Sequence, residues 1–359
     1  MTRTQPFDQA KAEAFAERML GALNGAGVAF LTSVAYRTGL LETLATQPPS
    51  TSEAIARAAG LQERYVRETL SGLVVCKVLD YDAASATFSL PPEHAACLTK
   101  AAGPDNMALL AQLLPLLGTV EDELIECFRN GGGVPYSSYP RFAKVMAETS
   151  APLYDRFLVD KMIPLVPELK ERLEKGIDAA DIGAGAGHAI NVLARAFPRS
   201  RFVGYDFSDE GLSLGVAEAQ AWGLQNAHFV VRDVAALGEH EAFDFITAFD
   251  TIHDQARPRS VLKGIHDALR PGGVFLMMDE GASSRLEENI DSPLTPLLYT
   301  FSTFHCMTVS LAYGGEGLGT CWGRQKALEL LAEAGFTDVG VTTIEGDIEH
   351  YYYIAGKPA

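Results

Sequence analysis

Short apolar runs alternate with longer amphipathic segments over the second half of the chain. The short runs predict buried strands, and apolar positions three to four residues apart predict helices between them. Strands alternating with helices indicate an α/β domain, a mostly parallel Rossmann-like sheet with helices on both faces. The predicted strands are a run just before Gly183 and residues 201–206, 227–232, 245–250 and 269–276, with a terminal antiparallel hairpin at 339–344 and 350–355; the predicted helices follow Gly187 and cover 210–222, 259–269 and 323–334.

The first hundred residues have a different order of elements. Their spacing predicts a long helix over 7–38, then helices over 40–45, 53–59 and 63–75, and a hairpin over 78–90. This is the order of a winged-helix unit. The apolar positions at near-helical spacing in the long helix are Phe15, Met19, Leu23, Phe30 and Leu31.

A helical pattern resumes at 104 and continues to about 175, broken by a glycine-rich stretch at 131–136. We therefore expect a winged-helix-like domain at 1–102, a helical connector at 103–175 and the α/β domain at 176–359. The α/β domain contains an insertion at 281–322, beside the carboxyl ends of the strands, with a flexible glycine run at 314–319. Such an insertion is a natural lid over a substrate site.

Composition narrows the class of protein. The chain has 359 residues, 47% of them hydrophobic, and a formal net charge of −17, which favours solubility over unspecific attraction to nucleic acid or anionic membranes. Its five cysteines are scattered and form no C-x-x-C pair, which indicates reduced thiols in a cytoplasmic protein. The N-terminus lacks a leader pattern, and the most apolar run, 107–120, is too short to span a bilayer.

The most informative motif is the run from Asp181 to Gly187, with the pattern D-x-G-x-G-x-G after an apolar run. Glycines at a strand-to-helix junction allow a tight turn and close approach to a ligand. The dinucleotide fingerprint G-x-G-x-x-G is not met, and an acid before the loop disfavours a phosphate but suits an ammonium or sulfonium group. An ordinary strand–helix turn remains the alternative for the motif alone.

Together with the acids that end the following strands and the turn at 270–273, this motif resembles motif I and the later landmarks of the class I S-adenosylmethionine (SAM) methyltransferases. The resemblance implies that Asp206 binds the ribose hydroxyls and Asp233 the adenine amino group. It implies SAM as cofactor and S-adenosylhomocysteine as product. The cofactor-binding residues implied in this way are Asp181, Gly183, Gly185, Gly187, Asp206, Phe207, Asp233, Val234, Phe249 and Asp250.

Candidate chemistry follows the fourth strand of the α/β domain, at His253 and Asp254. A neutral histidine can accept the proton of a hydroxyl or thiol acceptor near pH 7. The pair matches the His-Asp of the plant-type small-molecule O-methyltransferases, although Gln255 stands where that family has tryptophan. We expect His253 to be the base and Asp254 to orient it or to cap the next helix; the alternative is that His253 only lines the pocket. Asp279 or Glu280 could supply an acidic partner.

The helical connector and the insertion supply candidates for the acceptor site. Tyr139, Met146 and Tyr154 are expected to contact the substrate, with Phe142, although interdomain core is the plainer explanation for each. His305 is a further candidate on the insertion, and Cys306 and Glu316 are weaker ones. No metal site is predicted, because adjacent His and Cys residues make a poor chelate.

The winged-helix unit raises the question of DNA binding. Residues 1–100 contain nine Lys or Arg against ten Asp or Glu, so the unit lacks the cationic surface on which DNA affinity depends. Dimerisation and covering of the active site, as in the plant-type O-methyltransferases that this unit resembles, are the expected roles, and a homodimer is the expected assembly. The whole chain also looks like a group of bacterial methyltransferases of unassigned substrate. We therefore predict O-methylation of a small molecule; N-, S- or C-methylation and a SAM-responsive DNA-binding regulator remain open alternatives.

Overall fold

A computed structural model describes residues 7–358. The chain forms two compact units, Met1–Pro115 and Leu116–Ala359. The division falls inside the stretch predicted to be a helical connector, most of which belongs to the second unit. Residues 1–6, which are part of the predicted N-terminal domain and of the segment inspected for a leader, lie outside the described residues.

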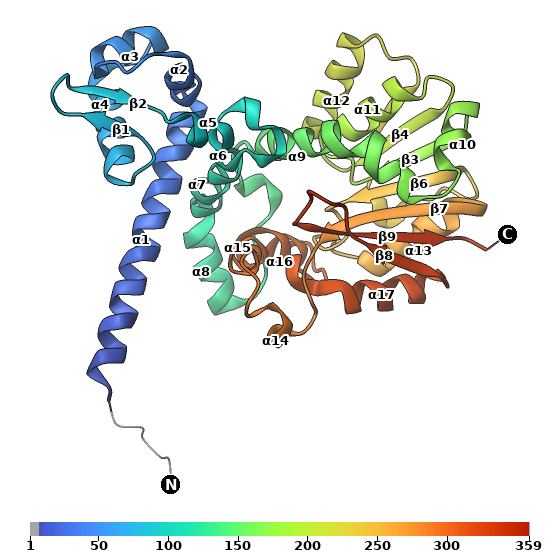
Figure 1. The fold of residues 1–359 in the computed structure, drawn as a ribbon. Coiled ribbons are helices and arrows are strands. Elements are labelled where there is room, and N and C mark those ends of the chain that lie inside the picture. The colour runs from blue at the N-terminus through green and yellow to red at the C-terminus, as the bar shows by residue number, and fades with distance from the viewer. Residues whose placement is uncertain (1–6, 359) are drawn as a thin grey trace. The chain divides into compact units, whose positions relative to one another are not determined.

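The first unit has the predicted winged-helix order (Figure 1). Thr51 caps α3 by accepting a hydrogen bond from the Ala54 amide, and Gly60 ends it with a positive φ of 67°. The first strand begins two residues later than predicted, because the amides of Val78 and Leu79 bond to the Leu73 carbonyl at the end of α4. The elements are α1 (Gln9–Arg37), α2 (Leu40–Thr46), α3 (Ser52–Ala59), α4 (Glu63–Val75), β1 (Asp80–Asp82), β2 (Thr87–Ser89), α5 (Pro92–Leu98) and α6 (Met107–Ala111), with α7 (Leu113–Leu117) at the division.

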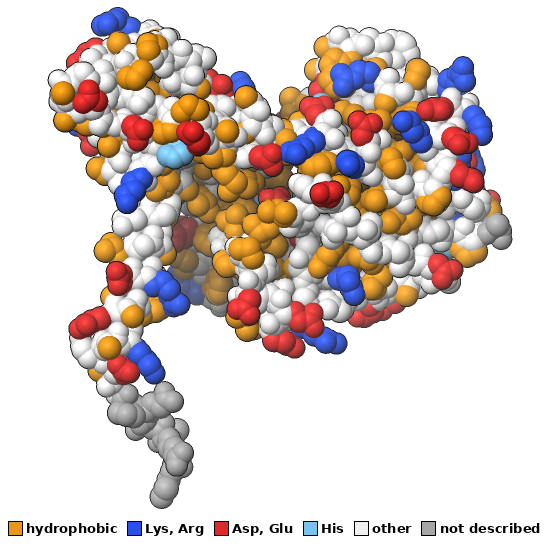
Figure 2. Space-filling view, in the orientation of Figure 1, with side chains coloured by type: hydrophobic (Ala, Val, Ile, Leu, Met, Phe, Trp, Pro, Cys, Tyr) orange, Lys and Arg blue, Asp and Glu red, His pale blue; other side chains and the backbone are white. Residues whose placement is uncertain are grey.

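Helix α1 confirms the helix predicted over 7–38, and most of its surface is exposed. Only Thr32, Ser33 and Ala35 are buried in this 29-residue helix. The apolar stripe is exposed, at Phe15, Met19, Leu23 and Phe30, while Leu31 packs against the core of the unit. Acidic, basic and hydrophobic side chains follow one another along the exposed part of α1 (Figure 2). By length and composition alone, α1 could also cross a membrane.

The second unit is built on a seven-stranded sheet of order β5-β4-β3-β6-β7-β9-β8. The five strands from β5 to β7 are parallel, and β9 pairs antiparallel with both β7 and β8. The predicted α/β sheet with an antiparallel terminal strand is thereby confirmed. The strands are β3 (Asp178–Ile182), β4 (Arg201–Asp206), β5 (Ala227–Val231), β6 (Phe243–Phe249), β7 (Leu269–Glu280), β8 (Val339–Thr342) and β9 (His350–Gly356).

Helices cover both faces of this sheet (Figure 1). Helices α10 and α11 pack on one face, and α13 and α17 on the other, each over its own buried apolar cluster. The carboxyl ends of the parallel strands therefore share one edge, where a ligand of an α/β sheet binds. The helices of this unit are α8 (Glu121–Asn130), α9 (Phe142–Phe157), α10 (Leu169–Lys175), α11 (His188–Ala196), α12 (Asp209–Ala221), α13 (Pro258–Ala268), α14 (Leu286–Asn289), α15 (Thr295–Phe301), α16 (Met307–Ala312) and α17 (Gly323–Ala334).

Candidate functional site

The glycine loop between β3 and α11 requires its glycines for two reasons. Gly183, Gly185 and Gly187 all have positive φ values, of 73°, 54° and 70°. A Cβ on Gly183 would lie 2.0 Å from the Thr251 hydroxyl, whereas a Cβ on Gly185 would meet no atom within 4 Å. The middle glycine therefore borders open space. The loop carries no lysine or arginine.

Asp206, at the end of β4, faces this loop. Its Oδ2 accepts a hydrogen bond from the Gly185 amide at 2.9 Å, and its Oδ1 accepts one from the Ser208 amide at 2.8 Å. Burial raises the pKa of this carboxyl, and the backbone hydrogen bonds oppose that rise. Each carboxylate oxygen keeps a second lone pair, so the group can still accept hydrogen bonds from a diol. Together with the open space at Gly185, this hydrogen-bond acceptor fits the adenosyl part of SAM.

Asp181 was expected to present a charged carboxylate at the start of the glycine loop, and its environment in the structure is different. Its carboxyl is buried on the sheet and accepts a hydrogen bond from the Thr247 hydroxyl at 2.7 Å. Burial raises its pKa to about 7, against the effect of that hydrogen bond, so the group is not a fixed charge facing the loop. Its contact with the cofactor stays a prediction.

Asp233, after β5, is half of an exposed ion pair with Arg257 at 2.5 Å, and its other oxygen accepts the Ala235 amide hydrogen bond. Val234 beside it is buried. The adenine contacts implied for this pair of residues also stay predictions.

Asp250 ends β6 in a conformation that residues other than glycine rarely adopt, with a φ of 48°. Its Oδ2 pairs with His350 Nε2 at 3.3 Å, and the other nitrogen of His350 bonds to Asp347 at 3.0 Å. Its Oδ1 is buried and has no hydrogen-bond partner within residues 7–358. The strained backbone and the unsatisfied oxygen are typical of a functional position.

Glu280 joins Asp250 and His350 in a group whose ligand atoms lie within 4.8 Å of one another, a spacing that a metal ion could bridge. Burial alone would lower the pKa of His350, but the Asp250 and Asp347 carboxylates outweigh it and raise that pKa well above its usual range. The imidazolium is then the cation of this group, and in that form it cannot ligate a metal. Burial, with the charge of Asp250, raises the pKa of Glu280 to about 8.

His253 is buried after β6 and is oriented by Asp279, at the end of β7, whose Oδ1 lies 2.9 Å from His253 Nδ1. Burial would lower the pKa of His253, but the Asp279 carboxylate outweighs it and raises that pKa well above its usual range. The neighbouring Cys306 thiol adds to this rise in pKa. With Nδ1 bound to a carboxylate, Nε2 is the nitrogen left for proton transfer.

The role predicted for Asp254 was wrong on both points, because Asp279 orients His253 and Arg257 occupies the N-cap of α13. The Asp254 carboxylate accepts a hydrogen bond from the Tyr136 hydroxyl instead. Burial raises the pKa of Asp254 to about 6, although His253 and Tyr136 both act to lower it. Of the two acids proposed as partners of the base, Asp279 and Glu280, the structure selects Asp279.

The insertion holds the loop that carries His253. The Gly319 amide donates to the His253 carbonyl at 3.1 Å, the Ser310 hydroxyl to the Gln255 carbonyl at 2.9 Å, and the Glu316 amide to the Ala256 carbonyl at 3.1 Å. A Cβ on Gly315 would lie 2.4 Å from the Ala256 Cα atom. Gly315, in the run predicted to be flexible, is therefore needed for close packing, and the insertion fixes the backbone of the loop that carries His253.

Four rings gather beside this loop: Tyr136, Tyr139, Phe142 and His305. His305 lies in a π-helical turn (Ser302–Cys306) and stacks on Phe142, with ring centroids 4.0 Å apart. Burial lowers its pKa to about 3, and its Nε2 has no partner among the described residues. Tyr136 also contacts Phe207, the residue after Asp206, at 5.1 Å. Sequence reasoning missed Tyr136, because no local pattern indicates its contacts with Phe207 and Asp254, which lie 71 and 118 positions further along the chain.

The other predicted acceptor residues are distributed as follows. The Tyr139 ring lies 4.9 Å from that of His305, and its hydroxyl donates to the Phe304 carbonyl at 2.5 Å. Tyr154 instead contacts Phe249, at 5.5 Å. Met146 lies between them in sequence on α9 and is partly buried. The structure thus brings Tyr139 to His305 and places Tyr154 against a residue predicted to bind the cofactor.

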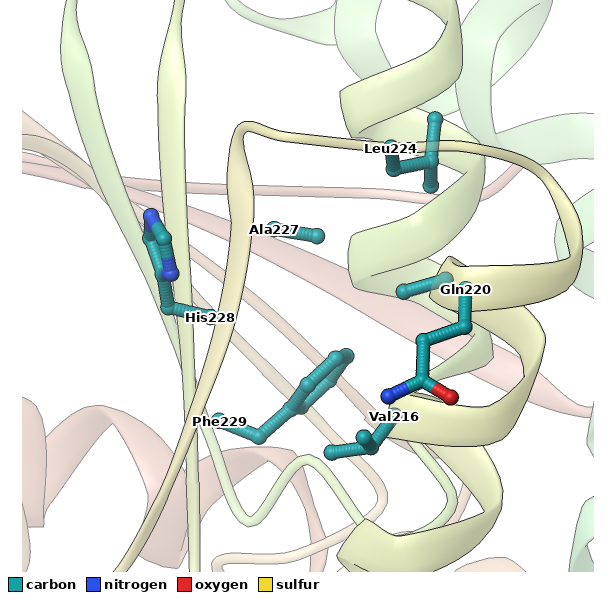
Figure 3. A pocket seen from close by; sticks show the side chains of 7 residues that line it. Val216, Gln220, Leu224, Ala227, His228 and Phe229 are labelled. Carbon is teal, nitrogen blue, oxygen red and sulfur yellow. The ribbon is translucent and has the colours of Figure 1, made fainter.

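A separate hollow lies between α12 and β5 (Figure 3). Seven side chains line it, and none of them was predicted as a site residue. The ring of Phe229, in its wall, would lie 2.3 Å from a Cβ on Gly187, so this wall supports the glycine loop from behind. The lining residues are Val216, Ala219, Gln220, Leu224, Ala227, His228 and Phe229.

Comparison with known proteins matches a domain family to each of the two units of the chain. Residues 26–100 match the Rv2258c-like winged HTH domain, and residues 173–335 match a methyltransferase domain family. A malonyl-[acyl-carrier protein] O-methyltransferase of Bacillus cereus is 24% identical over 154 residues, which are 42% of this chain and 51% of that relative. This chain thus spans about half the length of that relative.

Two solved structures are similar over nearly the whole chain. One of Nostoc punctiforme, described as a putative O-methyltransferase, has a TM-score of 0.71 at 18% identity and covers 96% of this chain and 98% of its own. Human N-acetylserotonin methyltransferase in complex with SAM has a TM-score of 0.69 at 18% identity and covers 100% of both chains. At this identity the likeness establishes the shared fold.

Proposed function

The chain joins a winged-helix domain to a class I methyltransferase domain, and we propose that it transfers a methyl group from SAM to an oxygen atom of a small acceptor molecule. The observation that carries the proposal is the arrangement at one edge of the sheet. A glycine loop without cations follows β3, and a histidine held through Nδ1 by a carboxylate follows β6. The first suits a cationic nucleoside, and the second suits proton abstraction from an acceptor.

SAM, when bound, supplies a methyl group on a cationic sulfur atom. The glycine loop and Asp206 would hold its adenosyl part, with Phe207, Asp233 and Val234 around the nucleoside and Phe249 and Asp250 near the amino-acid part. The buried Asp250 oxygen without a partner would accept a hydrogen bond from an ammonium group. Catalysis of such a displacement depends mainly on positioning the two reactants in line.

His253 would accept the proton of the acceptor hydroxyl at Nε2, while Asp279 stabilises the imidazolium that forms. Tyr139, Met146, Tyr154 and His305 would contact the acceptor. The rings near His305 favour a planar, partly apolar acceptor, with the free His305 Nε2 available to one polar group. Nitrogen, sulfur or carbon acceptors are the alternative, because an amine or a thiolate needs little help from a base.

Calorimetry tests the cofactor assignment. Replacing Asp206 by alanine should weaken SAM affinity about 100-fold, because two hydrogen bonds from the ribose to a charged group are lost. The wild-type protein is titrated with SAM, S-adenosylhomocysteine and NAD, and the variant with the first two. Asp209→Ala, an exposed acid three residues away, is the matched control. Unchanged affinity in Asp206→Ala would contradict the ribose contact, and heat with NAD alone would contradict the function.

A SAM-responsive DNA-binding regulator is the second candidate, because residues 26–100 match a winged helix-turn-helix domain. The presumed recognition helix α4 argues against it. Its arginines pair with acids on the same helix, Arg64 with Glu68 and Arg67 with Glu63, so little positive charge is left for phosphates. A shift of random DNA fragments by the protein at low salt, lost at higher salt, would favour the regulator.

The expected assembly is a cytoplasmic homodimer, formed through the exposed apolar stripe of α1. Replacing Met19 and Leu23 by glutamate should convert a dimer to a monomer in sedimentation equilibrium, because charges would be buried against the second copy. Glu17→Gln, on the same helix, is the control. A monomeric wild type would contradict the proposal, and flotation of the protein with neutral lipid vesicles would indicate that a membrane covers this helix instead.

A further inference from the structure

We propose that Trp322, in the insertion, is a positioning residue for the base: its indole N–H holds the Asp279 carboxylate against His253 and shares the charge of that carboxylate. The inference rests on the proposed function, in which His253 accepts a proton from the acceptor.

The two carboxylate oxygens of Asp279 differ in their number of hydrogen-bond partners. Oδ1 accepts three hydrogen bonds, each of 2.9 Å, from His253 Nδ1, Trp322 Nε1 and the Glu280 amide. Oδ2 is buried and has no partner within the described part of the chain. The carboxylate is fully buried, and Trp322 is 5% exposed. The hydrogen bond of Trp322 therefore acts on the same oxygen that orients the base, without competition from solvent.

Trp322 is itself fixed by the segment that holds the backbone of His253. The Trp322 amide donates to the Gly319 carbonyl at 3.0 Å, and the Gly319 amide donates to the His253 carbonyl at 3.1 Å. The Trp322 carbonyl accepts the Ser284 hydroxyl at 2.5 Å. Hydrogen bonds thus form a closed ring from the His253 carbonyl through Gly319, Trp322 and Asp279 to the His253 imidazole. Such a ring fixes both the backbone and the side chain of the base.

The effect of the Trp322 N–H on the pKa of His253 has a predictable direction. A donor on a carboxylate withdraws part of its negative charge from other partners, so Trp322 limits the rise that Asp279 imposes on the pKa of His253. Without this N–H, the carboxylate should hold the His253 proton more tightly. The other titratable groups around this imidazole are Asp254, Glu280, His305, Cys306 and Cys321.

The test is a titration of the His253 imidazole by NMR on the full-length protein with labelled histidine, with the signal assigned through His253→Gln. Trp322→Phe removes the N–H and should raise the pKa of His253 by about 0.5 pH unit or more. Trp222→Phe, at the only other tryptophan, is the matched control and should leave it unchanged. Benzothienylalanine at position 322 keeps the shape of the indole and lacks the N–H, so it serves if Trp322→Phe does not fold.

An unchanged or lowered pKa in the protein that lacks the N–H would overturn the inference. In the Asp279→Asn background, removal of the N–H should cause no further rise, and a rise of the same size there would also overturn it. The titration needs no acceptor or SAM. Failure of this inference is therefore separate from failure of the proposed function, which calorimetry with SAM decides.

Discussion

Replacing His253 by alanine should lower turnover about 100-fold or more and leave the affinity for SAM nearly unchanged. A positioned general base contributes roughly 10²–10⁴-fold to rate, and that contribution requires the imidazole itself. The cofactor contacts proposed above come from the glycine loop and Asp206, not from this side chain. Release of S-adenosylhomocysteine is measured with a panel of phenols, and SAM affinity is measured by calorimetry.

The same variant separates a base from a pocket-lining residue. If His253 removes the proton, the loss should shrink across a series of phenols of decreasing pKa, because the more acidic phenols ionise without help. His228→Ala, on β5 and away from Asp279, is the matched control. Equal turnover in wild type and His253→Ala, or a loss that is the same for every phenol, would assign His253 to the pocket wall.

The sheet and the glycine loop could be predicted because their signals are local. Most strands of the sheet contain a short apolar run, and the glycines of the loop from Gly183 to Gly187 lie within five residues of one another. The backbone angles confirm the reason for them, since all three have positive φ. The pattern could not reveal that Asp181, in the same motif, is buried against Thr247, because that contact depends on the register of β3 against β6.

The carboxylate that orients His253 was harder to predict, because it is distant in sequence. Asp254 follows His253 in sequence, but Asp279 is 26 residues away and reaches it because β7 pairs in register beside β6. Trp322 comes from the insertion, where no periodic pattern indicates which residues point inward. The glycine run at 314–319 looks the same in sequence whether it is mobile or tightly packed. Close contacts within the folded chain, among them that of Gly315 with Ala256, show that the run is tightly packed.

Helix α1 shows a different limit of prediction from sequence. Apolar spacing predicts correctly that the segment is a helix and that one face is apolar, but not what covers that face. Within this chain α1 extends past its neighbours, so that burial is confined to Thr32, Ser33 and Ala35 near its end. A pattern that arises from an intermolecular contact is indistinguishable in sequence from one that arises from the core.

Replacing Asp279 by asparagine should shift the pH dependence of the reaction to lower pH and lower its maximum about 10- to 100-fold. The carboxylate raises the pKa of His253, so its neutral form, which is the base, predominates only at higher pH in the wild type. Asparagine removes that charge, and burial then lowers the pKa of His253. The acid limb of kcat/KM should move to lower pH, while loss of the stabilised imidazolium reduces the rate at every pH.

Asp279→Asn should also lower the free energy of unfolding, and this loss should be largest at low pH. The pKa of His253 is raised in the folded protein, so its pairing with Asp279 contributes stability that is fully present below the unfolded value of about 6.5 and is lost as pH rises through the folded value. The wild type should exceed Asp279→Asn in unfolding free energy by about 3 kcal/mol near pH 6, a typical cost of breaking a buried pair. That difference should shrink as pH rises.

Urea unfolding at several pH values measures this difference in unfolding free energy, with Asp291→Asn, an exposed acid in the insertion, as the control. A difference that grows with pH would mean that His253 is held neutral in the folded protein, and would contradict the assignment of Asp279 as the group that raises its basicity.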